Sequence, residues 1–295
     1  MRLASLPEGK VGFTGGNTDF TRTNSTTTFI EAKEIVALNQ AQVTINRGNA
    51  TIFFSAATVT APKLTVENDA SLLITTAGGT ANTIDFRGEN PEIALQSEAQ
   101  LTISTVGTTA TPTNTTNNTV ALTGVAPKIS LNEKSLLRLT STLAKRGLHL
   151  VGADAQVSVK DSELVVTSAT QATVNLSGNQ PIFSAKNSTI ELTSTTGQRV
   201  NLVGETPQLN LSNTQLKLNA TTGRGLFLQG ATPQIDLDDS QLVVGDTGAS
   251  QGIILQGTDA FLALRNHSEL ALSGAGTGTT ENIQIGNNNA SPKIL

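Results

Sequence analysis

The 295-residue sequence has no cysteine, no tryptophan and no tyrosine, and only 14% of its residues are charged. Without cysteine, a disulfide framework and any metal site with thiolate ligands are excluded. Ordinary soluble domains carry charge on about a quarter of their residues, so threonine, serine, asparagine and glutamine must supply most of the polar surface. This composition is typical of a secreted protein that is stable without disulfide bonds.

The sequence also lacks a basic region and a long apolar segment. Its formal net charge is −4, which predicts neither a nucleic-acid partner nor attraction to an anionic membrane surface. No stretch approaches the roughly 18 consecutive apolar residues of a membrane-spanning helix, so we expect no membrane insertion. The opening residues MRLASLPEGK contain no apolar core of signal-peptide length.

What the sequence does contain is an internal repeat. Pro181, Pro207 and Pro233 are 26 residues apart, and each begins a unit with three short runs in which apolar and other residues alternate. Alternation with a period of two indicates a strand with one apolar face. In the unit that begins at Pro207, the apolar pairs are Leu209 and Leu211, Leu216 and Leu218, and Leu226 and Leu228.

Three strands in each unit of nearly fixed length predict a coil that closes a triangle and stacks on the next coil. The fold class is therefore all-β: a single-stranded parallel β-helix, or solenoid, with three strands per coil and about nine coils over residues 31–295. Residues 1–30 are expected to form an irregular leading segment or an irregular first coil. The last residues begin another repeat without completing it, so we expect a β-helix truncated at its C-terminal end, with neighbouring domains in a longer chain.

The corners of the coils repeat as well. A glycine follows most third strands, where we expect a sharp turn with positive φ. Between the first and second strands lie Asx-turn residues, which stacking would align into a polar ladder. The glycines are Gly88, Gly124, Gly152, Gly178, Gly204, Gly230 and Gly257, and the Asx pairs are Asp161-Ser162, Asn187-Ser188, Asn213-Thr214 and Asp239-Ser240.

The same pattern assigns side chains to the interior of the first legible coil. It places Val36, Leu38, Ile52 and Phe54 inward. Phe86 and Phe183 are also assigned to the core, whereas Phe227 falls on an outward position.

The repeat P-x-I-x-L-x-x-S-x-L-x-L…x-L-x-G, over about residues 34–295, resembles the pectate-lyase-like right-handed parallel β-helix of Gram-positive surface adhesins, of the WxL or cell-wall-anchored type. Passenger domains of Gram-negative autotransporters are similar in composition. The resemblance implies a right-handed coil and an extracellular location on the bacterial cell surface or cell wall. It implies a fold more than an activity, because enzymes, adhesins and phage spikes all use this fold.

Nearly all variation in length falls between the second and third strands, and the longest of these loops runs from Ser104 to Thr119. Insertions that share one face of a solenoid often mark its binding face. We therefore consider a ligand-binding edge for an anionic glycan or cell-wall polymer, although solvated loop charges and a tolerated surface loop are the plainer interpretation. Its candidate residues are Lys145, Arg146, Arg199, Arg224 and the outward Phe227.

Asp236, Asp238 and Asp239 form the one acidic cluster of the repeats, and oxygen ligands at such spacing could hold calcium. Polysaccharide lyases of this fold pair calcium with an arginine, but Arg224 falls on a different corner. A capping and turn role is the favoured interpretation, and no other cofactor is expected.

We expect a non-enzymatic adhesive or stalk module on a bacterial surface, whose partner is a host or cell-wall polysaccharide or a surface glycoprotein. One alternative is a polysaccharide lyase or glycoside hydrolase that acts in a groove along the β-helix. Another alternative is a purely structural spacer. A convergence of three charged groups on one face over adjacent coils would favour the enzyme.

Overall fold

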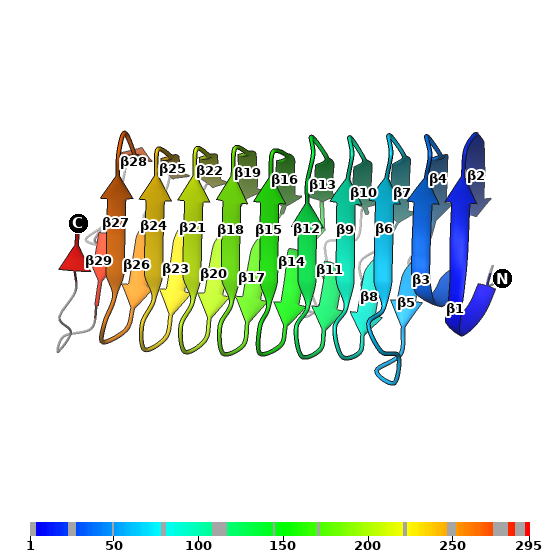
Figure 1. Cartoon of the computed structure of the whole chain (residues 1–295), viewed down its shortest axis with the longest axis horizontal. Helices are drawn as coiled ribbons and strands as arrows, with labels where there is room; N and C mark the ends of the chain where they lie inside the picture. The colour runs from blue at the N-terminus through cyan, green and yellow to red at the C-terminus, as the bar shows by residue number, and fades with distance from the viewer. Residues whose placement is uncertain are drawn as a thin grey trace.

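The computed structural model describes residues 4–22, 28–48, 50–77, 81–107, 117–143, 145–169, 172–220, 223–246, 252–273, 283–286 and 293–295. In these ranges all regular structure is β-strand. The strands stack into a rod whose two chain ends lie at opposite ends (Figure 1). None of the described segments forms a helix with the length and hydropathy needed to cross a membrane.

The strands form three parallel ladders, one for each side of the coil. The first ladder contains β6 (Lys63–Glu67), β9 (Glu92–Gln96), β12 (Lys128–Leu131), β15 (Gln156–Lys160), β18 (Ile182–Lys186), β21 (Gln208–Ser212), β24 (Gln234–Asp238), β27 (Phe261–Arg265) and β30 (Lys293–Ile294). The second contains β2 (Asn17–Arg22), β4 (Gln42–Arg47), β7 (Ser71–Ala77), β10 (Gln100–Val106), β13 (Leu136–Ser141), β16 (Glu163–Ser168), β19 (Thr189–Ser194), β22 (Gln215–Ala220), β25 (Gln241–Asp246) and β28 (Glu269–Ser273). The third contains β5 (Phe53–Ser55), β8 (Ile84–Arg87), β11 (Asn118–Thr123), β14 (Arg146–Val151), β17 (Val174–Ser177), β20 (Val200–Val203), β23 (Leu226–Gln229), β26 (Ile253–Gln256) and β29 (Ile283–Ile285).

Each strand pairs with the equivalent strand of the next turn, so residues one repeat apart are register partners. Val157, Phe183, Leu209 and Ile235 form one such column in the first ladder, and all four are fully buried. The apolar core therefore runs without a break along the rod axis. The fold is the predicted right-handed parallel β-helix with three strands per turn and about nine turns.

The N-terminal residues continue the same ladders. β1 (Ala4–Thr14) pairs with β3 (Ile30–Leu38), and β2 pairs with β4. Both β1 and β3 are long because they run straight through the corner that separates third and first strands in later turns. The pairing of β1 with β3 shifts register between Leu6 and Lys10, which makes this first course irregular. Residues 4–22 thus belong to the solenoid, and the boundary expected at residue 30 lies inside β3.

Three residues of the first legible coil were assigned to the wrong face, although Ile52 is buried in the core as predicted. Ile35 and Ala37 are the register partners of the inward Leu64 and Val66, so Val36 and Leu38 point the other way. Likewise Phe53 pairs with the inward Ile84, and Phe54 pairs with Asp85 on the outer face. Apolar residues occupy both faces here, and a slip of one residue exchanges the faces of a strand.

The corner glycines are required for a different reason from the one expected. Of the seven, only Gly88 has a positive φ, at 147°. A Cβ atom added at Gly204 would lie 2.0 Å from the carbonyl oxygen of Gly178 and 2.6 Å from Cδ of Pro181. The glycines are therefore needed because the backbones of successive turns pass too close for a side chain.

The predicted polar ladder is present at the first-to-second corner. Asn213 Nδ2 donates to Asn187 Oδ1 (3.0 Å), and Asn187 Nδ2 donates to Asp161 Oδ1 (2.8 Å). Beneath this exposed row, the Ser188 N–H donates to Thr214 Oγ1 (3.3 Å), and the Thr214 N–H donates to Ser240 Oγ (3.1 Å). Side chains thereby add axial hydrogen bonds to those of the strands.

Candidate functional site

The loop edge between the second and third ladders was the first candidate. Most of its longest loop, residues 108–116, lies outside the described residues, as do 170–171, 221–222 and 247–251. The structure does describe the cationic candidates that were expected to stand on this edge.

Two of these cations lie inside the rod rather than on its surface. Lys145 is 2% exposed, and its Nζ donates to the Ala81 carbonyl oxygen at 2.6 Å. Burial lowers the pKa of Lys145 to about 8. Arg199 is 0% exposed, and its Nη1 donates to the Gly223 carbonyl oxygen at 2.6 Å. The prediction that these two residues present charge to a surface polymer was wrong.

They belong to a buried polar lane that follows the second-to-third corner. One column of register partners at the ends of the second-ladder strands is polar and buried: Arg47, Thr76, Thr105, Ser141, Ser168 and Ser194. The lane supplies partners for backbone groups where the chain leaves one sheet for the next, as when Ser168 Oγ donates to the Lys145 carbonyl oxygen at 2.5 Å. Our sequence interpretation missed this lane, although continuing the alternation two residues past Leu192 leads to Ser194.

The remaining loop-edge candidates are near the surface. Arg146 is half-buried and Arg224 is exposed. Phe227 does point outward but is only 8% exposed, and the Cζ atom of Arg224 lies 5.0 Å from its ring centroid. This cation–π contact covers the face that a ligand would have to use.

The outer face of the third ladder carries a short hydrogen-bonded row beside Arg146. Asn201 Nδ2 donates to Asn175 Oδ1 at 2.5 Å, so the Asn175 amide nitrogen faces His149 Nδ1, 2.8 Å away. The amide donates and the imidazole Nδ1 accepts, which requires an unprotonated Nδ1. Burial, and secondly the charge of Arg146, lower the pKa of His149 to about 4.

The three aspartates do not converge on a common ligand. Asp236 Oδ2 lies 3.1 Å from Arg265 Nη2, and Asp238 Oδ1 accepts a hydrogen bond from Asn266 Nδ2. Asp239 occupies the corner with φ 50°, and its Oδ1 lies 3.5 Å from His267 Nδ1. Within the described ranges, no three histidine, aspartate or glutamate side chains form a metal-binding group. The favoured turn interpretation therefore fits Asp239.

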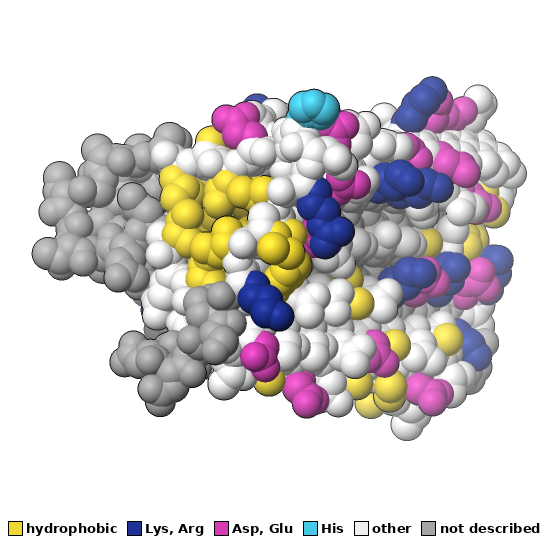
Figure 2. Space-filling view, turned by 60° about the vertical axis from the view of Figure 1, so that its left-hand side comes forward, with side chains coloured by type: hydrophobic (Ala, Val, Ile, Leu, Met, Phe, Trp, Pro, Cys, Tyr) yellow, Lys and Arg dark blue, Asp and Glu magenta, His cyan; other side chains and the backbone are white. Residues whose placement is uncertain are grey.

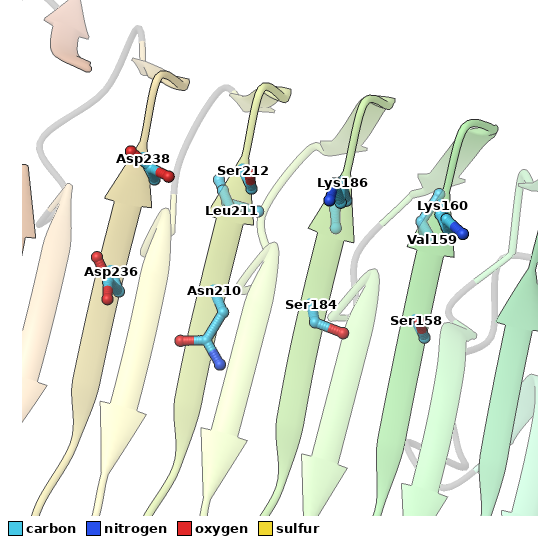
Figure 3. A pocket seen from close by; sticks show the side chains of 11 residues that line it. Ser158, Val159, Lys160, Ser184, Lys186, Asn210, Leu211, Ser212, Asp236 and Asp238 are labelled. Carbon is cyan, nitrogen blue, oxygen red and sulfur yellow. The ribbon is translucent and has the colours of Figure 1, made fainter. Parts of the chain in front are cut away.

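Two grooves that the sequence pattern did not predict run across several turns. One, of about 330 Å³, lies on the outer face of β15, β18, β21 and β24 (Figure 3). The other, of about 610 Å³, follows the Asx corner and includes a row in which Gln215 Nε2 donates to Gln241 Oε1 at 2.6 Å. The amides of that row already bind each other, and Gln241 Nε2 also donates to Glu269 Oε2 at 2.8 Å. The first groove differs in carrying both lysines and aspartates.

Two rows of side chains line the 330 Å³ groove. In the upper row of Figure 3, Lys160, Lys186, Ser212 and Asp238 are successive register partners. In the lower row they are Ser158, Ser184, Asn210 and Asp236. Ammonium groups thus stand at one end, carboxylates at the other, and hydroxyl and amide groups between them.

The surface elsewhere is mixed. Figure 2 shows charged side chains of both signs on the flank and a gathering of hydrophobic side chains towards the C-terminal end. At that end Ile294 and Leu295 are 66% and 72% exposed.

Comparison of the chain with protein-family models, with curated proteins and with solved structures gave no match.

Proposed function

We propose that the chain is part of a non-enzymatic, rod-shaped module on a bacterial cell surface, which acts as a stalk and as an adhesive for polysaccharides or surface glycoproteins. The observation that supports this proposal is the unbroken axial core. One column of buried residues follows another through all three ladders, so the turns form a single stiff unit.

A stalk must hold its length outside the cell. Parallel turns are about 4.8 Å apart, and each is joined to the next by strand hydrogen bonds, to which the Asx and hydroxyl ladders add in the turns from Asp161 to Ser240. In such a solenoid, stability comes from the interfaces between neighbouring turns. The rod reaches this stability without cysteine, which suits an extracellular position.

An adhesive also needs polar groups that a saccharide can meet. The outer faces supply repeated hydroxyl and amide side chains one turn apart, in the grooves on the first ladder and on the Asx corner. Because their register is fixed by the ladders, these groups are held in place before a ligand arrives, which lowers the entropic cost of binding.

The test is an array of glycans and cell-wall polymers, probed with and without calcium while the release of reducing ends is followed. We expect binding without release and without dependence on calcium. Release of reducing ends would contradict the non-enzymatic assignment and move the case to a lyase or hydrolase. If neither binding nor release were detected, the adhesive function would be contradicted and a purely structural spacer would be favoured.

A further inference from the structure

We propose that the groove on β15, β18, β21 and β24 binds a short glycan that carries one acidic sugar. This inference rests on the proposed adhesive function and gives it a location and a ligand class. It moves the binding site from the loop edge to the outer face of the first ladder.

The anionic sugar belongs at the lysine end. Lys160 and Lys186 are exposed register partners on adjacent turns, about 4.8 Å apart along the rod. Like charges placed directly opposite each other repel, and within the described residues neither lysine forms an ion pair. A carboxylate between the two ammonium groups would make charge-assisted hydrogen bonds to both.

The other end suits uncharged sugars. Asp236 already lies against Arg265, and Asp238 already accepts a hydrogen bond from Asn266. The second carboxylate oxygen of Asp238 can accept a hydrogen bond from a sugar hydroxyl, as can Asn210 and Ser212 beside it, whereas Oδ1 of Asp236 is buried. A polymer with an acidic group on every sugar would meet these carboxylates and be repelled, so we infer a single charge.

A glycan fits this surface better than a peptide. The backbone groups of β18 and β21 are taken up by pairing with the turns on either side, so a peptide cannot add to the sheet as a further strand. The groove offers side-chain hydroxyl, amide and charged groups, and its volume of about 330 Å³ lies at the lower end of the range for small-ligand pockets.

The experiment is a calorimetric titration of the full chain with 3′-sialyllactose, which has one carboxylate, and with lactose, which has none. We expect the acidic trisaccharide to bind and lactose to bind about tenfold more weakly. The double variant K160Q/K186Q should lose about tenfold in affinity for the trisaccharide, because two charge-assisted contacts are removed. K217Q changes an exposed lysine on β22, in the other sheet, and should bind as the wild type does.

Equal affinity of the wild type and K160Q/K186Q for the trisaccharide would overturn the assignment, as would equal binding of lactose. Tighter binding of a uronic-acid hexamer, or of a peptide with one carboxylate, would overturn the ligand class. Array binding that K160Q/K186Q retains would refute the groove and leave the adhesive function standing. Release of reducing ends, together with a groove that still selects the trisaccharide, would refute the non-enzymatic function and leave the groove assignment intact.

Discussion

The N-terminal and C-terminal turns of this rod close their first-to-second corner in different ways. In the earlier turns two consecutive residues have positive φ and an alanine follows, as in Ser97 (58°), Glu98 (64°) and the fully buried Ala99. In the four corners from Asp161 to Ser240 one residue has positive φ and a hydroxyl follows, as in Asn187 (50°) and the buried Ser188. The corner after β27 again has three residues, Asn266, His267 and Ser268. The turn that contains Glu133, Lys134 and Ser135 stands between the two types.

Backbone satisfaction explains the difference. In the longer corner the chain folds back on itself, and the Ala41 N–H reaches the Leu38 carbonyl oxygen at 3.2 Å within its own turn. The shorter corner has no such acceptor in its own turn, and the Ser188 N–H uses the hydroxyl of Thr214 in the next turn instead. Because a buried N–H must be satisfied, shortening the corner by one residue requires a hydroxyl. The hydroxyl oxygen of the next turn thus replaces the carbonyl acceptor that the longer corner provides within its own turn.

The largest effect is expected where two turns approach most closely. Gly204→Ala in the C-terminal half would place its Cβ 2.0 Å from the Gly178 carbonyl oxygen, and we expect it to lower the free energy of unfolding by about 3 to 5 kcal/mol. The matched control is Gly12→Ala in β1, whose Cβ would lie 3.4 Å from Val36 Cγ2. Denaturant unfolding of both variants measures the contrast, and equal losses would show that the glycine column is not a packing requirement.

The next effect concerns Lys145, in the turn where the corner changes type. Its folded pKa of about 8 lies below the model-peptide value of 10.5, so the unfolded chain binds the proton over this interval and the folded chain does not. Stability therefore falls as the pH drops from 10.5 to 8. Relative to Lys145→Met, the wild type should gain up to about 3 kcal/mol between pH 8 and pH 10.5.

Denaturant unfolding of the wild type and Lys145→Met at several pH values measures this difference. Lys217→Met, at an exposed lysine on β22, is the control for the loss of one positive charge. A constant difference between the wild type and Lys145→Met would contradict the buried, neutral amine.

The smallest effect tests the corner itself. Thr214→Ala removes the acceptor of the Ser188 N–H and should cost about 1 to 2 kcal/mol, whereas Thr214→Ser keeps the hydroxyl and should cost less. Ala99→Ser in the longer corner should have little effect, because the Ser135 hydroxyl in such a corner donates to the nearby Asn132 carbonyl oxygen at 2.6 Å. Thermal unfolding of the three variants measures these differences. A clear loss of stability in Ala99→Ser would contradict the expectation that the longer corner tolerates a hydroxyl.

These corners also show how far the sequence could be interpreted. The repeat length predicted the ladders, and alternation predicted the buried columns, because both follow from the two-residue period of a strand. The phase failed at Val36, Leu38 and Phe54, where both faces are apolar and the pattern holds no information on direction. The Asx ladder was predictable because its members recur at one position in four consecutive turns.

The errors share another cause. The roles of Gly204 and Lys145 depend on contacts with residues of other turns, 26 or more positions away in the sequence. No local feature of the sequence indicates these contacts. A lysine beside a loop is usually solvated, yet here the interior holds carbonyl oxygens that need donors. The charged groove on β15 to β24 was missed because its residues are unremarkable within any single repeat and gain meaning only as neighbours across four.

The equal length of consecutive turns has a consequence for inheritance. Because Pro181, Pro207 and Pro233 are 26 residues apart and every turn meets its neighbours through the same columns, residues 181–206 can be lost or copied as a unit while all remaining partners keep their register. Over these turns the rod can therefore lengthen or shorten in steps of 26 residues.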